Sequence, residues 1–587
     1  MKAKNKCNFF TKHLIFSCVL FILACGTPKK KIVQSNWDFK PEYICSFAKL
    51  YGYVAYFHPT TEAMSMDWDK FLTKSIAELD GIKTDSAFKN KLLEIFNPVC
   101  YDLKIHITEP ILDTLIQRNP EDLFYIHYGL EERDINIYQS IVKNLDSCEL
   151  ETKPKYSTIK KEIGKNLWIT LPIIIPKDYQ IETDSFYQRE IESVNVDFSN
   201  AEDEVTQLAS FIKTWNIFNH FYPYNDIANV DMSVTLFKNV SAICLGGMDT
   251  YHYSMTLAKF LNEMQDGHGT VYHSLFNEFH YLPFICERIE GKVCVVNSFD
   301  ERIIVGDEIL SISGIPIEQI FNFQMNFYSG SFQHRQNLVL SFLFPIQTTD
   351  IEFSSSVSIR RGLEIYSFSD VNRSILHNDI SRLYREKEEY KIINEGLYYI
   401  NLTSIRTETW QKILPEIEKK DLIFDLRGYA SELTLDVLGH ISTDTINSPK
   451  WEIPIITSPD FENVVFDTSN WKISPKSPHF SGKIVFLCNE EAGSATETCL
   501  DIVSHYQLGY LVGSNTVGVN GNMNCFQTPG GFHVCFTGMK VRKRDGSPLH
   551  LVGIKPDFIC NQSINGVLQG KDDVLEFAIK LLCTPNN

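Results

Sequence analysis

A serine at the start of a helix can act as a nucleophile, and the sequence places Ser494 at such a point. Residues 484–488 (IVFLC) are apolar and predict a strand buried on both faces, which residues 489–493 end. Apolar residues at helical spacing predict a helix from about Ser494 onward. Free N–H groups in the first turn of a helix stabilise a developing oxyanion. The alternative role for this serine is a helix N-cap, which the local pattern alone favours.

The residues around Ser494 resemble a peptidase motif. AGSATE at residues 492–497 is similar to the nucleophile motif of the C-terminal-processing (tail-specific) serine peptidases. The resemblance makes Ser494 the nucleophile, Gly493 part of the preceding small-residue run and Glu497 the motif glutamate. Three other stretches match in the family's order, namely GDEILSISGIP at 306–316, DLIFDLRG at 421–428 and GIKPD at 553–557. Four ordered motifs are a strong signal, although each alone is weak.

The resemblance also implies an oxyanion hole. Gly428 follows the expected strand at 422–426, and its backbone N–H would pair with that of Ala495 to hold the oxyanion. The family's Asn-x-Gly-Gly after Arg-Gly is here YASE at residues 429–432, so the geometry of this turn is expected to differ.

The general base is expected to be His268. In one branch of the family a lysine follows the nucleophile by 25 residues, and Val519 stands there in this chain. The tricorn-core and interphotoreceptor-retinoid-binding-protein-like branch uses a histidine after a helical domain, which His268 in DGHG (266–269) resembles. A neutral imidazole accepts a proton near neutral pH. A structural histidine is the alternative. The residues before Gly553 offer no secure match to the glutamate that completes the tetrad of that branch, so no group that orients His268 is predicted.

Two stretches upstream repeat one pattern. FAKLYGYVAYFHP (47–59) and FIKTWNIFNHFYP (211–223) share Phe, Lys, Phe and Pro at matching positions, and the same shift of 164 residues relates Asp67 to Asp231. The repeat predicts two copies of a helix, a turn and a second helix. Its aromatic residues, with His58 and His220, are expected in the core and not in a ligand site.

Length and pattern predict a multidomain protein of α/β and α+β parts. A chain of 587 residues, 44% hydrophobic and 22% charged, is long enough for about four globular domains. We expect an N-terminal α+β domain at 37–200, a helical domain carrying His268 at 201–275, a PDZ-like domain at 280–365 and the catalytic domain at 375–587. The resemblance implies a ClpP/crotonase-like catalytic fold. The PDZ-like domain would bind peptide C-termini or serve only as a spacer.

The first residues resemble an export signal. Residues 1–25 combine a basic front, an apolar core and ILAC, which resembles a lipobox ending at Cys25, and residues 26–36 read as a polar tether. This predicts an extracytoplasmic protein held by a lipid on a bacterial membrane, in the periplasm or at the outer membrane. An uncleaved signal anchor is the alternative. The net charge of −18 argues against a nucleic-acid partner.

The fifteen cysteines show no metal-binding spacing, so we expect neither a metal nor another cofactor. Most lie in apolar runs, where a thiol packs as a small hydrophobic group. Cys525 and Cys535 flank Pro529-Gly530-Gly531 symmetrically, so they either form a bridge across a hairpin or remain buried thiols.

These observations together predict a lipid-anchored serine-type endopeptidase, a hydrolase that cleaves peptides or proteins through an acyl-enzyme on Ser494. The alternative is a catalytically inactive lipoprotein of the same fold that binds a peptide or a small ligand, because retinoid-binding relatives keep the fold without evident proteolysis. The sequence leaves the substrate and the oligomeric state open.

Overall fold

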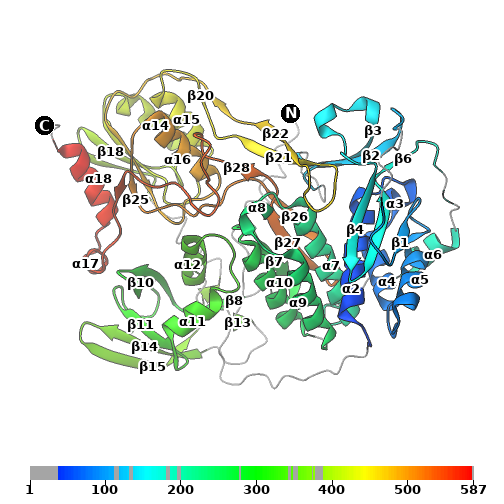
Figure 1. Ribbon diagram of the computed structural model, residues 1–587. Helices are drawn as coiled ribbons and strands as arrows, with labels where there is room; N and C mark the ends of the chain where they lie inside the picture. Colours follow the sequence, from blue (N-terminus) through cyan, green and yellow to red (C-terminus); the bar gives the residue numbers. More distant parts are fainter. Residues whose placement is uncertain are drawn as a thin grey trace.

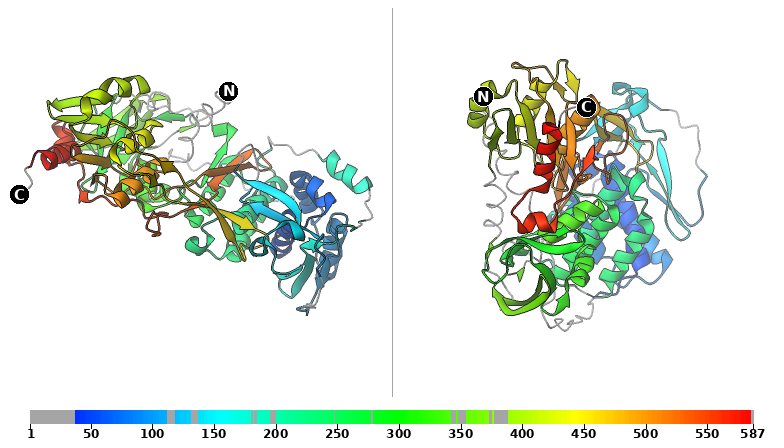
Figure 2. Two further views of the ribbon diagram at one scale, coloured as in Figure 1. Left: turned by 90° about the horizontal axis from the view of Figure 1, so that it is seen from above. Right: turned by 90° about the vertical axis from the view of Figure 1, so that its left-hand side faces the viewer.

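A computed structural model describes residues 37–584 except 112–117, 131–136, 180, 182–184, 195–199, 247, 277–278, 342–345, 348–353, 373–374 and 377–387. Cys25, the signal and the tether lie outside the described residues. The molecule is elongated, with a part of mixed helices and strands at one end and two sheet-rich parts at the other (Figures 1 and 2). Within the described ranges, no helix has the length and apolar character needed to cross a membrane.

The C-terminal part is built on a six-stranded sheet. Its strands lie in the order β17 (Tyr390–Asn394), β18 (Leu397–Asn401), β19 (Asp421–Asp425), β24 (Ile484–Cys488), β25 (Tyr510–Gly513) and β29 (Phe558–Ile559). All neighbours are parallel except β17, an antiparallel edge strand. All five residues of β24 are buried, as its apolar run predicts, because helices cover both faces of the sheet. The predicted strand at 484–488 is thereby confirmed.

Helices on the two faces of this sheet explain that burial. One face packs against α14 (Thr407–Ile417), α15 (Leu433–Ile441) and α16 (Ala495–Tyr506), and the other against α18 (Asp573–Cys583). Burying one Val, Leu or Ile side chain stabilises the fold by roughly 1.5–3 kcal/mol. This packing makes the carboxyl end of β24 a rigid support for the turn that carries Ser494.

A strand-rich module follows the second set of helices, which ends at Met264 (Figure 1). Its antiparallel sheet has the order β15 (Glu364–Asn372), β14 (Ser354–Arg361), β11 (Glu308–Ile312), β10 (Lys292–Ser298) and β9 (Phe284–Ile289), with β12 (Ile315–Pro316) beside β11. Glu290 and Gly291 form the turn between β9 and β10, and both have positive φ, as a type I′ hairpin turn requires. Helices α11 (Ile317–Gln324) and α12 (Phe332–Ser341) complete the module.

The predicted repeat is confirmed and proves longer than the sequence indicates. Helices α2 (Pro41–Phe57), α3 (Thr61–Ser65), α4 (Trp68–Ala77) and α5 (Asp85–Phe96) recur as α7 (Glu204–Phe221), α8 (Asn225–Ala228), α9 (Met232–Cys244) and α10 (Thr250–Met264). Asp67 and Asp231 cap the third helix of each copy with their side chains. A strand then follows in each copy, β1 (Lys104–His106) or β7 (Thr270–His273).

The duplication continues into the sheets. β1 pairs with the hairpin of β4 (Thr158–Gly164) and β5 (Leu167–Pro172), and β7 pairs in the same order with that of β26 (Met523–Gln527) and β27 (Phe532–Thr537). A second hairpin, β2 (Leu123–Tyr128) with β3 (Gln139–Asn144), matches β21 (Trp451–Ile456) with β22 (Val465–Ser469). In the second copy, the strand-rich module and the C-terminal sheet interrupt this series of elements.

The two copies face each other about an approximate two-fold axis. Helix α2 packs on α9, and α4 correspondingly packs on α7. A Cβ built on Gly52 would lie 1.8 Å from Oδ1 of Asn216, the matching position of the other copy. Strands β2 and β21 also pair, with His127 opposite Ile456 and Tyr128 opposite Ile455. One continuous core therefore spans both copies.

Candidate active site

Ser494 lies at the turn between β24 and α16, in an unusual backbone conformation. Its φ of 54° and ψ of −120° belong to a region that residues other than glycine rarely adopt. Its side chain makes no capping hydrogen bond, unlike the side chain of Ser563, which accepts from Gly566 N–H at the start of α17 (Ile564–Leu568). Strained residues of this kind concentrate at functional sites, so the geometry favours a chemical role over a capping role.

Buried Glu497 fixes the loop that faces this serine. Its carboxylate accepts hydrogen bonds from the Thr516 hydroxyl, from Gly518 N–H at 2.7 Å and from Val519 N–H at 2.9 Å. The carbonyl of Val519 in turn accepts from Ser494 N–H at 2.6 Å. Burial raises the pKa of Glu497 to about 8, although the three donors oppose that shift. The motif glutamate therefore acts on the loop beside the serine.

The backbone N–H groups of the two predicted oxyanion donors differ in their hydrogen bonds. Ala495 is the first residue of α16, so its N–H has no acceptor within the helix. Gly428 follows β19 as expected, with φ of 141°, but its N–H donates to Leu426 O at 3.0 Å. The hydroxyl of Thr496 joins the two segments, donating to Gly428 O at 2.9 Å and accepting from Ala430 N–H at 2.8 Å.

His268 comes to the same loop from the second helical copy. A Cβ built on Gly267 would lie 2.0 Å from a methyl carbon of Val519, whose carbonyl also binds Ser494 N–H. Val519 therefore contacts both segments, which are more than 200 residues apart in the sequence. Helix α12 packs over them, where the imidazole of His334 hydrogen-bonds Gly267 O at 3.1 Å. Burial, and then the proximity of His334, lower the pKa of His268 to about 4.

Two residues that sequence reasoning did not assign hold His268. Its Nδ1 lies 2.9 Å from the hydroxyl of Thr537, and its backbone N–H donates to Asp266 Oδ1 at 3.1 Å. Asp266 was visible two positions before the histidine. Thr537, at the end of β27, lies 269 residues away and carries no sequence signal that links it to His268.

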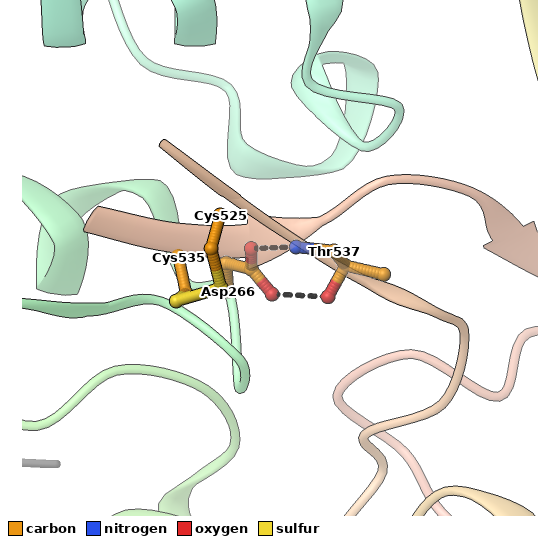
Figure 3. The surroundings of a disulfide bond; sticks show 4 residues. All are labelled: Asp266, Cys525, Cys535 and Thr537. Carbon is orange, nitrogen blue, oxygen red and sulfur yellow. Dashed lines mark hydrogen bonds between the residues drawn. A yellow bond between two sulfur atoms is a disulfide. The ribbon is translucent and has the colours of Figure 1, made fainter. Parts of the chain in front are cut away.

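The disulfide Cys525–Cys535 lies beside this group (Figure 3). The two cysteines are opposite each other in the ladder between β26 and β27. Of the two alternatives for this pair, the bridge across the hairpin is the one that the structure contains. Strand β27 also pairs with β7, which begins two residues after His268. The hairpin thus links the segments that carry Thr537 and His268.

Comparison with known proteins finds a family match in the C-terminal part of the chain. Residues 396–560 match the description "Peptidase family S41". This C-terminal part of the chain is therefore similar to peptidase family S41. The match indicates that the protein is a serine-type peptidase, and the matched residues include Ser494, Glu497 and Gly428. A comparison with curated proteins finds no match.

Solved structures of other proteins have a similar fold. Mature CPAF complexed with lactacystin matches at 14% identity over 64% of this chain and 97% of that chain, with a TM-score of 0.53. Mature CPAF alone gives the same identity and score over 64% and 96%. A putative peptidase from Parabacteroides merdae matches at 16% identity over 65% and 98%, with a TM-score of 0.41. The two CPAF structures thus share the mixed α/β fold that the sequence predicts.

Proposed function

We propose that this S41 peptidase cleaves peptides or proteins through an acyl-enzyme on Ser494, with His268 as the general base. The observation that carries the proposal is the strained Ser494, held on Val519 where the His268 loop also packs. The serine Oγ attacks the substrate carbonyl while its proton passes to the imidazole, which then protonates the departing amine. Water deprotonated by the same imidazole releases the acyl group and restores the serine.

The oxyanion would be held at the start of α16. Ala495 N–H is the first donor, because the helix leaves it free. Gly428 is the second, and its peptide must turn away from Leu426 O before its N–H can reach a substrate. Glycine has the conformational freedom for that turn.

The strand-rich module would act as a PDZ-like domain at 280–365, next to a ClpP/crotonase-like domain at 375–587. A PDZ groove takes a free C-terminal carboxylate, so amidating a substrate's C-terminus should slow its cleavage. Helix α12 supports a role near the site, because Gln333 and Asn337 donate to the carbonyls of Thr516 and Glu490. Equal rates for the acid and the amide would leave the module a spacer.

The anchor stays a proposal from the sequence. Lipidation at Cys25 would hold the peptidase on an extracytoplasmic membrane face, in the tricorn-like branch of the family. Cys25→Ser should release the protein from membranes or leave it unprocessed, as fractionation and intact mass would show. An unchanged mass and distribution would contradict the anchor.

A fluorophosphonate probe tests the catalytic proposal directly. The probe should label the wild type and fail to label Ser494→Ala. Ser563→Ala is the matched control, because that serine also precedes a helix but caps it, so labelling should persist. A folded wild type that resists the probe would favour the inactive binding protein instead.

A further inference from the structure

The hydroxyl of Thr537 lies between a buried carboxylate and the imidazole of His268. Thr537 donates to Asp266 twice, from its N–H at 2.6 Å and from its hydroxyl at 2.5 Å (Figure 3). The same hydroxyl oxygen lies 2.9 Å from His268 Nδ1. Asp266 and Thr537 are almost fully buried, at 0% and 1% exposed, so water does not compete for these contacts.

The directions of these hydrogen bonds fix the proton on His268. An ionised carboxylate only accepts, so the single hydroxyl proton of Thr537 points at Asp266. The hydroxyl oxygen can then only accept from the imidazole, which requires the proton on Nδ1. Nε2 is left with the lone pair that a general base needs.

We propose that Asp266 and Thr537 are the positioning residues of His268, which set its orientation and its Nδ1–H tautomer. The inference rests on the proposed role of His268 as base. Neither residue needs to touch the substrate, because both act through the imidazole. Substituting the carboxylate that orients a catalytic histidine lowers kcat by about 10⁴ in a serine protease where this was measured.

Protonation of Asp266 would reverse the direction of the hydrogen bonds from His268 through Thr537 to Asp266. Burial raises the pKa of Asp266 to about 6, against the hydrogen bonds from Thr537 and His268. A protonated carboxyl can donate to Thr537, whose hydroxyl can then donate to Nδ1 and leave the proton on Nε2. The other titratable groups that face this cluster are His334 on α12, His550, and Tyr222 and Tyr224 after α7.

Substitutions separate this role from simple support of the fold. Thr537→Val keeps the shape and removes the hydroxyl, while Thr537→Ser keeps the hydroxyl. We expect Thr537→Val and Asp266→Asn to lower kcat by on the order of a hundredfold or more at nearly constant KM, and Thr537→Ser to restore most of it. Asp102→Asn is the matched control, because Asp102 is exposed in the corresponding connection of the first copy.

A spectrum of the wild type tests the tautomer without any variant of Thr537. With ¹⁵N-labelled histidine at pH 8, the signal that His268→Ala removes should show a proton on Nδ1. A proton on Nε2 would overturn the inference, as would full kcat in folded Thr537→Val. If Ser494→Ala also kept full activity, the proposed function itself would fail. An essential Ser494 with an indifferent Thr537 would refute the positioning role alone.

Discussion

At the scale of single residues, the loop that carries Val519 connects the two segments of the candidate site. Val519 occupies the position of the lysine in the other family branch, and its carbonyl and methyl groups contact the segments of Ser494 and His268. A valine cannot accept the serine proton, so the proposed mechanism needs a base from another part of the chain. The fold supplies His268 next to the same residue.

The pH dependence of cleavage should reveal the environment of His268. Only the neutral imidazole accepts a proton, and a pKa lowered to about 4 keeps it neutral well below its ordinary 6.5. The acid limb of kcat/KM should therefore have its midpoint below about 6, within the range set by His268 and Asp266. Initial rates from pH 4 to 8 measure this limb. A midpoint at 6.5 or higher would contradict the lowered pKa.

Replacing Glu497 should destabilise the loop at residues 516–519, because its carboxyl group holds that loop in place. Glu497→Gln keeps the size but replaces one carboxyl oxygen by an amide N–H₂, so either Gly518 N–H or Val519 N–H loses its acceptor. Leaving a buried donor unsatisfied costs about 1–3 kcal/mol, so we expect a loss of that order in unfolding free energy and slower probe labelling. Glu576→Gln on α18 is exposed and serves as the control. Equal stability of the two variants would exclude this role for Glu497.

The sequence singled out the proposed nucleophile and base but not the residues that contact His268. Ser494 and His268 stand in motifs whose residue types are visible locally. Thr537 is found only through the tertiary pairing of β27 with β7. Its hydroxyl is one of many in the chain, and nothing in its own neighbours connects it to the histidine.

At the scale of elements, the β26–β27 hairpin holds the segment that ends in Thr537. A disulfide constrains the unfolded chain, and the loop it closes here spans 10 residues. Replacing both cysteines by alanine should lower the unfolding free energy by about 3 kcal/mol. Activity should persist below the midpoint, because the strand ladders still hold β27.

Urea unfolding of the double variant measures this difference. Cys583→Ala, which removes an exposed free thiol, is the control and should leave the unfolding midpoint unchanged. Loss of activity in a variant that is still folded would mean that the bridge itself shapes the site.

Sequence reasoning found two helices of the repeat and missed its sheets. The spacing between copies stays near 164 residues as far as α10, so equivalent residues align without a gap. Beyond β7, the inserted module and the C-terminal sheet change the spacing between equivalent elements of the two copies. The later strands correspond only through their pairing, which no local pattern records.

At the scale of the whole molecule, the approximate two-fold axis predicts one sensitive position. Gly52 faces its counterpart Asn216, and an added Cβ would lie 1.8 Å from Oδ1 of that side chain. Gly52→Ala should lower the melting temperature by overpacking, a cost of about 1–3 kcal/mol. Gly396→Ala is the control, because the nearest atom to its Cβ lies at 3.5 Å. A wild-type melting temperature for Gly52→Ala would contradict close contact on the axis.

Acid should destabilise the whole fold through its histidines. Burial lowers the pKa of six buried or partly buried histidines to about 4 or below, namely His58, His127, His220, His268, His334 and His550. A group whose pKa is lower in the folded state contributes stability above its unfolded pKa of about 6.5, and that stability is lost as pH falls toward 4. Glu497, Asp266 and Asp501 have raised pKa values, so they oppose the trend by binding protons in the folded state.

The balance of these groups predicts a steep loss of stability between pH 6.5 and 4.5. Six histidines against three carboxyls leave an excess of about three protons in the unfolded state, or roughly 2–4 kcal/mol per pH unit. Urea unfolding at several pH values measures this slope. His550→Phe should reduce it by about one proton, because the new ring can keep the stack on Tyr224. A flat profile, or stability that rises on acidification across this range, would mean that the histidines are not held neutral by burial.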